Sequence, residues 1–189
     1  MHNIAIFASG YGSNLEAICN ACSSGEIPAK VVLVVCDCPG ARSANLARSM
    51  GIDVFEFNPK DYAGKPEYEA VISQKCKNAG VELICLAGYM RIIGEVLLGD
   101  FRNRIINIHP SLLPAFKGAH AIKDALEYGV KVFGVTIHFV DETLDGGKII
   151  SQQAIPYEGA DLEEITVMTH AVEHELYVKT IKKLLSCGL

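Results

Sequence analysis

Short runs of apolar residues alternate with amphipathic stretches from the start of the chain. The runs at residues 4–8, 31–36 and 81–87 consist almost entirely of Val, Ile, Leu, Ala and Cys. Such composition is typical of strands that are covered by helices on both faces, and the stretches between them have helical spacing. Strands and helices that alternate at this spacing predict βαβ units and a parallel sheet.

The alternation predicts where the individual strands and helices lie. In the first half we expect strands at residues 4–8, 31–36, 53–57 and 81–87, and helices at 13–24, 42–50 and 67–79. In the second half we expect strands at 104–108, 133–140 and 148–155, and helices at 122–128 and 162–185. The last two strands are close enough in sequence to pair antiparallel. The predicted fold is a single Rossmann-like α/β domain over residues 1–189, with a mixed, mostly parallel central sheet flanked by helices.

Composition and charge exclude several classes of protein. The net charge is −5, and no run of Lys and Arg resembles a surface that binds nucleic acid. The longest apolar run, residues 31–36, is far shorter than the roughly 20 residues of a membrane-spanning helix. The start, Met1-His2-Asn3, lacks the basic residues of a signal peptide. We therefore expect a cytoplasmic protein with neither nucleic acid nor membrane as partner.

Seven cysteines suit a reducing compartment, because an odd number of thiols in apolar runs indicates packing rather than disulfides. The pairs Cys19-x-x-Cys22 and Cys36-x-Cys38 have spacings found in four-thiolate zinc sites. However, Cys19 and Cys22 fall on a predicted helix, and neither pair lies in a glycine-rich knuckle. We expect buried, reduced thiols.

A second pattern that suggests a metal is the string His170-Ala171-Val172-Glu173-His174, which matches the zinc-protease motif H-x-x-E-H. A catalytic zinc there needs a third protein ligand. The only acid that follows is Glu175, which a helix turns about 100° away from His174. We therefore predict no metal.

A glycine-rich segment, Ser-Gly-Tyr-Gly-Ser-Asn-Leu at residues 9–15, connects the first predicted strand to the first helix. Small residues at a helix N-terminus allow backbone N–H groups to face an anion. Leu15 stands where a dinucleotide-binding loop has its third glycine, and no Walker pattern is present. These features favour a phosphate monoester over a nucleotide. Ser13 and Glu16 also match a capping box, which is compatible with phosphate binding.

Asn107 and His109 lie two residues apart in a predicted strand, so both side chains project to the same side while Ile106 and Ile108 point into the core. Pro110 lacks an N–H and ends the strand there. His109 is thus expected at the carboxyl end of the strand, where open parallel sheets bind ligands. An acidic loop near this edge, at residues 141–147, contains Asp145 before two glycines. Such loops are usually solvated turns, and Asp145 matters only as a carboxylate for His109.

Four segments together resemble the phosphoribosylglycinamide formyltransferases, a family of folate-dependent enzymes of purine synthesis. They are residues 9–15, 86–92 (Leu-Ala-Gly-Tyr-Met-Arg-Ile), 107–114 (Asn-Ile-His-Pro-Ser-Leu-Leu-Pro) and 144–147 (Leu-Asp-Gly-Gly). The Asn-x-His and Asp core also occurs in methionyl-tRNA formyltransferase and formyltetrahydrofolate deformylase. The glycine loop and the helix that carries Glu173 are more typical of the glycinamide enzymes, and at 189 residues we do not expect the extra domain that the other two carry.

The resemblance implies transfer of the formyl group of 10-formyltetrahydrofolate to the amine of glycinamide ribonucleotide in de novo purine biosynthesis. A formyltetrahydrofolate hydrolase or another formyl-folate transferase remains the alternative. A binding protein with this fold could use the loop as a phosphate sensor, but it has no need for Asn107, His109 and Asp145 together. Monomer and homodimer both remain open.

The resemblance also implies which residues bind each substrate. Gly12, Ser13 and Asn14 would hold the phosphate, and His170 and Glu173 would line the ribose and glycinamide end. Folate would be bound by Lys65, Met90, Arg91, Ile92, Ile93, Asn107, Asp141, Glu142, Thr143, Leu144 and Asp145. Lys65 stands where some members have Arg, which keeps the charge but loses a two-pronged grip on a carboxylate.

Formyl transfer passes through a tetrahedral intermediate that carries an oxyanion. The amide NH2 of Asn107 and a protonated His109 can both donate to that oxygen, and such donors typically contribute about 3–4 kcal/mol each. His109 can also protonate the departing folate nitrogen. The carboxylate of Asp145 favours the charged imidazole and can take the proton of the attacking amine. Asn107, His109 and Asp145 are therefore the predicted catalytic residues.

Overall fold

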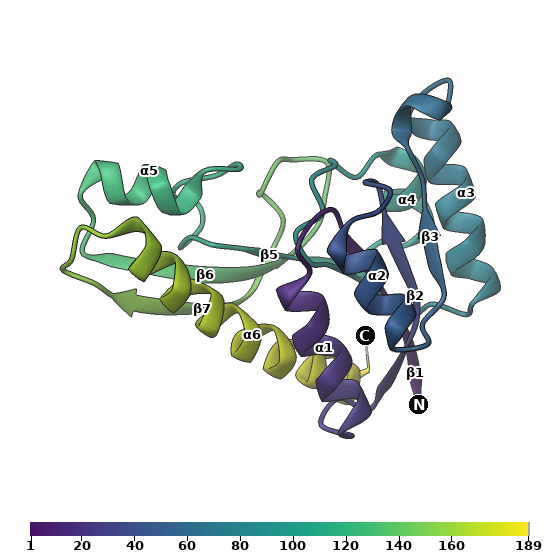
Figure 1. Ribbon diagram of the computed structural model, residues 1–189, viewed down its shortest axis with the longest axis horizontal. Coiled ribbons are helices and arrows are strands. Elements are labelled where there is room, and N and C mark those ends of the chain that lie inside the picture. The colour runs from purple at the N-terminus through teal and green to yellow at the C-terminus, as the bar shows by residue number, and fades with distance from the viewer. Residues whose placement is uncertain (189) are drawn as a thin grey trace.

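The computed structural model describes residues 1–188, whose seven strands form one sheet in the order β3-β2-β1-β4-β5-β6-β7 (Figure 1). The strands are β1 His2–Ala8, β2 Ala29–Cys36, β3 Val54–Glu56, β4 Leu83–Leu86, β5 Ile105–His109, β6 Val132–Phe139 and β7 Ile149–Pro156. The helices are α1 Ser13–Ser23, α2 Arg42–Ser49, α3 Lys65–Asn78, α4 Glu95–Asp100, α5 Ala121–Tyr128 and α6 Leu162–Cys187, with a 3-10 turn, η1, at Pro59–Asp61.

The predicted mixed sheet is confirmed. Strands β1 to β5 pair in parallel, β6 runs antiparallel to β5, and β7 runs antiparallel to β6. The chain moves outward from β1 through β2 to β3, then returns to the other side of β1 for β4 and β5. The loops after β1 and β4 therefore diverge at the carboxyl edge of the sheet. This reversal of strand order is the place where open α/β sheets bind ligands.

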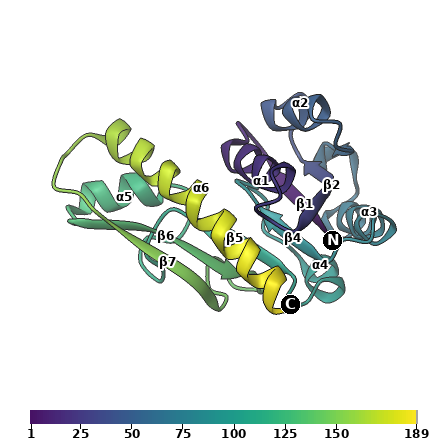
Figure 2. The same cartoon turned by 90° about the horizontal axis from the view of Figure 1, so that it is seen from below.

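Alternate residues of β1 face two separate hydrophobic layers. Ile4 and Ile6 of β1 belong to the layer beneath α1 and α6, whereas Ala5 and Phe7 belong to the layer beneath α3 and α4. Helix α1 packs against α6, which runs obliquely across its face of the sheet (Figure 2). Because helices bury both faces of these strands, the strands have the near-continuous apolar sequence that predicted them.

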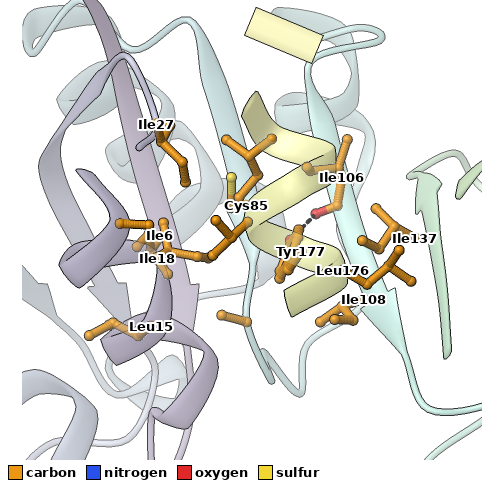
Figure 3. Close-up of a cluster of buried hydrophobic side chains, with 14 of the residues drawn as sticks. Ile6, Leu15, Ile18, Ile27, Cys85, Ile106, Ile108, Ile137, Leu176 and Tyr177 are labelled. Atoms are coloured by element: carbon orange, nitrogen blue, oxygen red, sulfur yellow. Dashed lines mark hydrogen bonds between the residues drawn. The ribbon is translucent and has the colours of Figure 1, made fainter. Parts of the chain in front are cut away.

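Tyr177 of α6 contacts β4 and β5 at the centre of the larger hydrophobic layer. Its ring is fully buried, and the single proton of its hydroxyl is shared between the backbone oxygens of Leu86 at 2.9 Å and Ile106 at 3.2 Å. Figure 3 shows the bond to Ile106. Leu15 and Ile18 of α1 fill the same layer. The long final helix thereby fixes the carboxyl end of β4 relative to the first half of β5.

The structure corrects some local predictions. Helix α4 and the 3-10 turn η1 lie in segments for which no element was predicted, and the strand expected at 53–57 spans only Val54–Glu56. The capping box is also wrong. Gly12, in the left-handed region at φ 84°, is the N-cap of α1, and Glu16 pairs with Arg42. Within residues 1–188, no helix combines the length and apolarity needed to cross a membrane.

Candidate active site

A cleft of about 800 Å³ lies at the carboxyl edge of the sheet. Its walls come from the loops after β1 and β4, the end of β5, the β6–β7 loop at residues 140–148, and α6. Four apolar side chains on its rim are each more than half exposed: Tyr11, Met90, Ile92 and Leu144. Exposed apolar surface around a concave polar floor is typical of a site that binds a flat organic ligand.

His109 is the last residue of β5 and is buried at the floor of the cleft. Its Nε2 lies 2.8 Å from the backbone oxygen of Phe116. Because a carbonyl only accepts, Nε2 carries a proton and donates it. The other ring nitrogen, Nδ1, lies 3.6 Å from Oδ2 of Asp145. That separation exceeds a direct hydrogen bond, so Nδ1 can still interact with a substrate atom.

Asp145 reaches the cleft from the β6–β7 loop, where its backbone has φ 47°. Its Oδ2 accepts a hydrogen bond of 2.9 Å from the backbone N–H of Gly118, and its Oδ1 lies 3.9 Å from Nε2 of His138. The loop passes very close to β6, since a Cβ atom on Gly147 would lie 1.8 Å from the backbone oxygen of Phe139. Only glycine permits this approach, which brings the carboxylate towards the imidazoles.

His138 is a site residue that the sequence analysis missed. It stands directly opposite Asn107 in the β5–β6 pair, is 2 % exposed, and lines the cleft. Its Nδ1 donates to the backbone oxygen of Phe139 at 2.8 Å, so in the neutral ring Nε2 accepts from Nδ2 of Asn107 at 3.2 Å. Burial lowers the pKa of His138 and favours this neutral form. One N–H of Asn107 is thus held, and the other is available to a ligand.

The glycine loop is fixed by both neighbouring helices. A Cβ atom on Gly12 would lie 2.9 Å from Cβ of Ser43, so α2 abuts the loop there. The backbone N–H of Ser43 donates to the oxygen of Gly10 at 3.1 Å. Ser13 begins α1, and Asn14 follows it with Nδ2 donating to Oε2 of Glu173 at 3.0 Å. The loop that was predicted to bind phosphate therefore lies beside α6.

Glu173 and His170 both line the cleft from α6. Glu173 is 6 % exposed, and burial raises the pKa of its carboxyl, while the hydrogen bond from Asn14 opposes that shift. His174, the next residue of the H-x-x-E-H string, lies instead in a shallow groove between α1 and α6. In the part of the chain that the structure describes, no three His, Cys, Asp or Glu side chains are grouped to hold a metal.

The thiols of the two cysteine pairs with zinc-like spacing are free, and Cys19, Cys22 and Cys36 are buried. Burial raises the pKa of Cys19 to about 12 and that of Cys22 to about 11. Such thiols stay protonated at neutral pH and are poor metal ligands and nucleophiles.

Comparison with known proteins identifies the family. The family model described as formyl transferase matches residues 2–181. The chain belongs to the formyl transferase family. It is 47 % identical to the phosphoribosylglycinamide formyltransferase of Bacillus subtilis, over 98 % of this chain and 95 % of that protein. It is 41 % identical to the trifunctional purine biosynthetic protein adenosine-3 of Drosophila melanogaster over 97 % of this chain, which corresponds to 14 % of that much longer protein.

Solved structures agree with this assignment. The phosphoribosylglycinamide formyltransferase of Bacillus halodurans superposes with a TM-score of 0.94 at 48 % identity, covering 97 % of this chain and 95 % of that one. Glycinamide ribonucleotide transformylase 1 of Geobacillus kaustophilus gives 0.95 at 45 % identity, covering 98 % and 99 %. Formyl transferases of this family use 10-formyltetrahydrofolate as co-substrate.

In this formyl transferase, most residues predicted to bind folate lie on the cleft. Lining it are Met90, Arg91, Ile92, Ile93, Asn107, Asp141, Thr143, Leu144 and Asp145. The structure does not bring Lys65 and Glu142 to this lining. Lys65 is the first residue of α3, where its charge lies near the buried carboxyl of Glu69, and Glu142 is exposed on the β6–β7 loop.

Proposed function

We propose that this protein transfers the formyl group of 10-formyltetrahydrofolate to the amine of glycinamide ribonucleotide. The observation that carries the proposal is the meeting of Asn107, His109 and Asp145 in one cleft with the glycine loop. The glycine loop, the Asn107–His109 pair and Asp145 come from three separate parts of the sequence, and we infer that transfer from a folate to a phosphorylated amine uses all of them. Family membership and the names of the relatives support the same reaction.

Asn107 and His109 act on the formyl oxygen. When the amine attacks the formyl carbon, the C=O double bond opens and its oxygen becomes an oxyanion. The N–H of Asn107 that His138 leaves unused can donate to this oxygen. The Nδ1 of His109 can do so when protonated, since Nε2 remains bound to Phe116. Two fixed donors aimed at a developing charge lower the barrier without reorganisation.

Collapse of the intermediate breaks the bond between the formyl carbon and the folate nitrogen. That nitrogen leaves as a secondary amine after taking a proton, which His109 supplies. The attacking amine must lose a proton in exchange. The carboxylate of Asp145, 3.6 Å from Nδ1 of His109, accepts that proton directly or through water and stabilises the imidazolium before transfer.

The glycine loop and α6 orient the phosphorylated amine. The backbone N–H groups of Gly12, Ser13 and Asn14 at the start of α1 suit the phosphate. We infer that Glu173, which accepts a hydrogen bond from Asn14, holds the glycinamide end, and that His170, one helical turn earlier, contacts the ribose. Folate then occupies the remaining apolar side of the cleft, between residues 90–93 and 141–145.

The test is a formyl-transfer assay with purified protein, 10-formyltetrahydrofolate and glycinamide ribonucleotide. We expect formylglycinamide ribonucleotide and tetrahydrofolate in equal amounts. His109→Ala should lower the chemical step by about 10²-fold or more, the usual contribution of a general acid. Rapid deformylation of the folate without any amine would instead identify a hydrolase. Absence of product with this amine would overturn the proposed acceptor.

A further inference from the structure

The loops after β1, β2 and β4 begin side by side at the carboxyl edge of the sheet, and the carboxylate of Asp37 joins all three. Asp37 directly follows β2, and its side chain is 1 % exposed. Its Oδ1 accepts from the hydroxyl of Ser9, the first residue after β1, at 2.5 Å. Its Oδ2 accepts from Nε of Arg91, in the loop after β4, at 2.7 Å. A buried carboxylate with a charged donor and a hydroxyl donor is well compensated.

Ser9 passes this connection on to the loop after β4. While its hydroxyl donates to Asp37, the same oxygen accepts from the backbone N–H of Met90 at 2.8 Å. The backbone N–H of Ser9 donates to the oxygen of Gly88 at 3.1 Å. Because a serine hydroxyl has one proton, an acceptor at Asp37 also determines which way Ser9 faces Met90.

The two loops that Asp37 joins belong to different substrates in the proposed function. Ser9 begins the glycine loop, which continues to Gly12, Ser13 and Asn14. Met90 and Arg91 belong to the loop assigned to folate. The catalytic residues lie elsewhere, on β5 and the β6–β7 loop, so none of them contacts Asp37.

Arg91 shows how Asp37 acts on a ligand-binding side chain. Only Nε of its guanidinium has a hydrogen-bond partner among the described residues, and about half of the side chain is exposed on the cleft. Binding Nε to a fixed carboxylate selects one orientation of the planar group. The terminal nitrogens then remain available to folate.

We propose that Asp37 is a positioning residue that holds the phosphate-binding loop and the folate-binding loop in one register. It contacts neither substrate. Through Ser9 it orients the start of the first loop, and through Arg91 and Met90 it orients the second. Loss of its charge therefore weakens binding of both substrates and leaves the chemical step on His109 unchanged. This inference rests on the proposed function for the identity of the two ligands.

The test compares Asp37→Asn with the wild type in the formyl-transfer assay. Asn keeps the size but loses the charge that binds Arg91. We expect KM to rise about tenfold for both substrates, the lower range for one charge-assisted hydrogen bond, with kcat within about threefold. Calorimetric titration with glycinamide ribonucleotide and with unformylated tetrahydrofolate should show parallel losses of affinity. A changed kcat with unchanged KM values, or loss for one ligand alone, would overturn the proposal.

Two further variants complete the test. Glu56 of β3 pairs with Arg48 of α2, and neither residue lines the cleft. Glu56→Gln removes the charge of that pair and should leave both KM values unchanged. Ser9→Ala removes the hydroxyl while Asp37 keeps its bond from Arg91, and it should raise both KM values. If Asp37→Asn does not fold, the result for Ser9→Ala alone tests the proposal. In the double variant, the two effects should be less than additive because they interrupt one network. Additive effects would contradict it.

If the wild type forms no product from glycinamide ribonucleotide, the proposed function fails, whatever the Asp37 variants do. If the wild type is active and Asp37→Asn and Ser9→Ala match it in both KM values, only the positioning role fails. The two outcomes are therefore distinct.

Discussion

Replacing Asp145 by Asn isolates the contribution of one negative charge to catalysis. Asn has the same shape, and it tolerates the positive φ of 47° better than most residues. Its amide oxygen can keep the 2.9 Å hydrogen bond from Gly118. The fold and the loop should therefore remain, while the charge beside His109 disappears.

The expected loss follows from the distance between the charges. Oδ2 of Asp145 lies 3.6 Å from Nδ1 of His109. For two unit charges at about this separation and an effective dielectric constant of about 20, the attraction is about 4 kcal/mol. If the imidazolium is formed in the transition state and this attraction is lost, the rate should fall by about 10³-fold.

Single-turnover formyl transfer at saturating substrates measures this loss directly, because product release does not contribute. The matched control is Asp124→Asn on α5, an exposed acid outside the cleft, which should behave as the wild type. A folded Asp145→Asn protein that loses less than about tenfold would refute the reasoning. The charge would then contribute little to stabilising the imidazolium.

Three further predictions use matched pairs of variants. Gly12→Ala should weaken binding of glycinamide ribonucleotide in calorimetry and leave the affinity for tetrahydrofolate nearly unchanged. The control Gly25→Ala has a similar positive φ but open space around the added Cβ, so it should lower only the stability, by about 1–2 kcal/mol. Equal affinities of the two variants for glycinamide ribonucleotide would count against a phosphate-binding loop. Tyr177→Phe should lower the free energy of unfolding by about 1–3 kcal/mol in urea titration, while exposed Tyr128→Phe should not; equal stabilities would mean that the buried hydroxyl contributes nothing. Burial lowers the pKa of His138 in the folded state, so as pH falls the unfolded chain binds a proton at His138 before the folded protein does. The free energy of unfolding should therefore fall as pH drops below about 6.5. His138→Gln should flatten this decline between pH 7 and 5 relative to exposed His120→Gln, and parallel declines would contradict the assignment.

The layered fold was predictable because each strand carries its own signal. Continuous apolar runs such as those in β1 and β2 require helices on both faces, and the antiparallel pair β6 and β7 follows from a short connection. Helix α4 was not predictable in this way. It has six residues, and its start depends on Glu69 of α3, whose Oε1 accepts from the backbone N–H of Gly94 at 2.6 Å. A cap from another element leaves no local pattern.

The same distinction applies within the cleft. Asn107 and His109 could be proposed from their spacing in one strand, and the structure brings Asp145 to them. The predicted capping box is wrong because Gly12, in a left-handed conformation, is the N-cap. No residue after Gly12 in the sequence indicates that conformation. Ser13 therefore enters the helix instead of capping it.

The roles of His138 and Asp37 could not be predicted from any local pattern in the sequence. Each is an ordinary polar residue in or just after a strand, and each acquires a role only through a partner on a neighbouring element. For His138, that partner is Asn107, and their juxtaposition depends on the register of β5 against β6. A slip of one residue would turn His138 to the opposite face. For Asp37, the partners follow β1 and β4, and they become neighbours only because strand order reverses between these strands. Residues of this kind maintain geometry rather than react, so their effects should appear in the orientation of other groups.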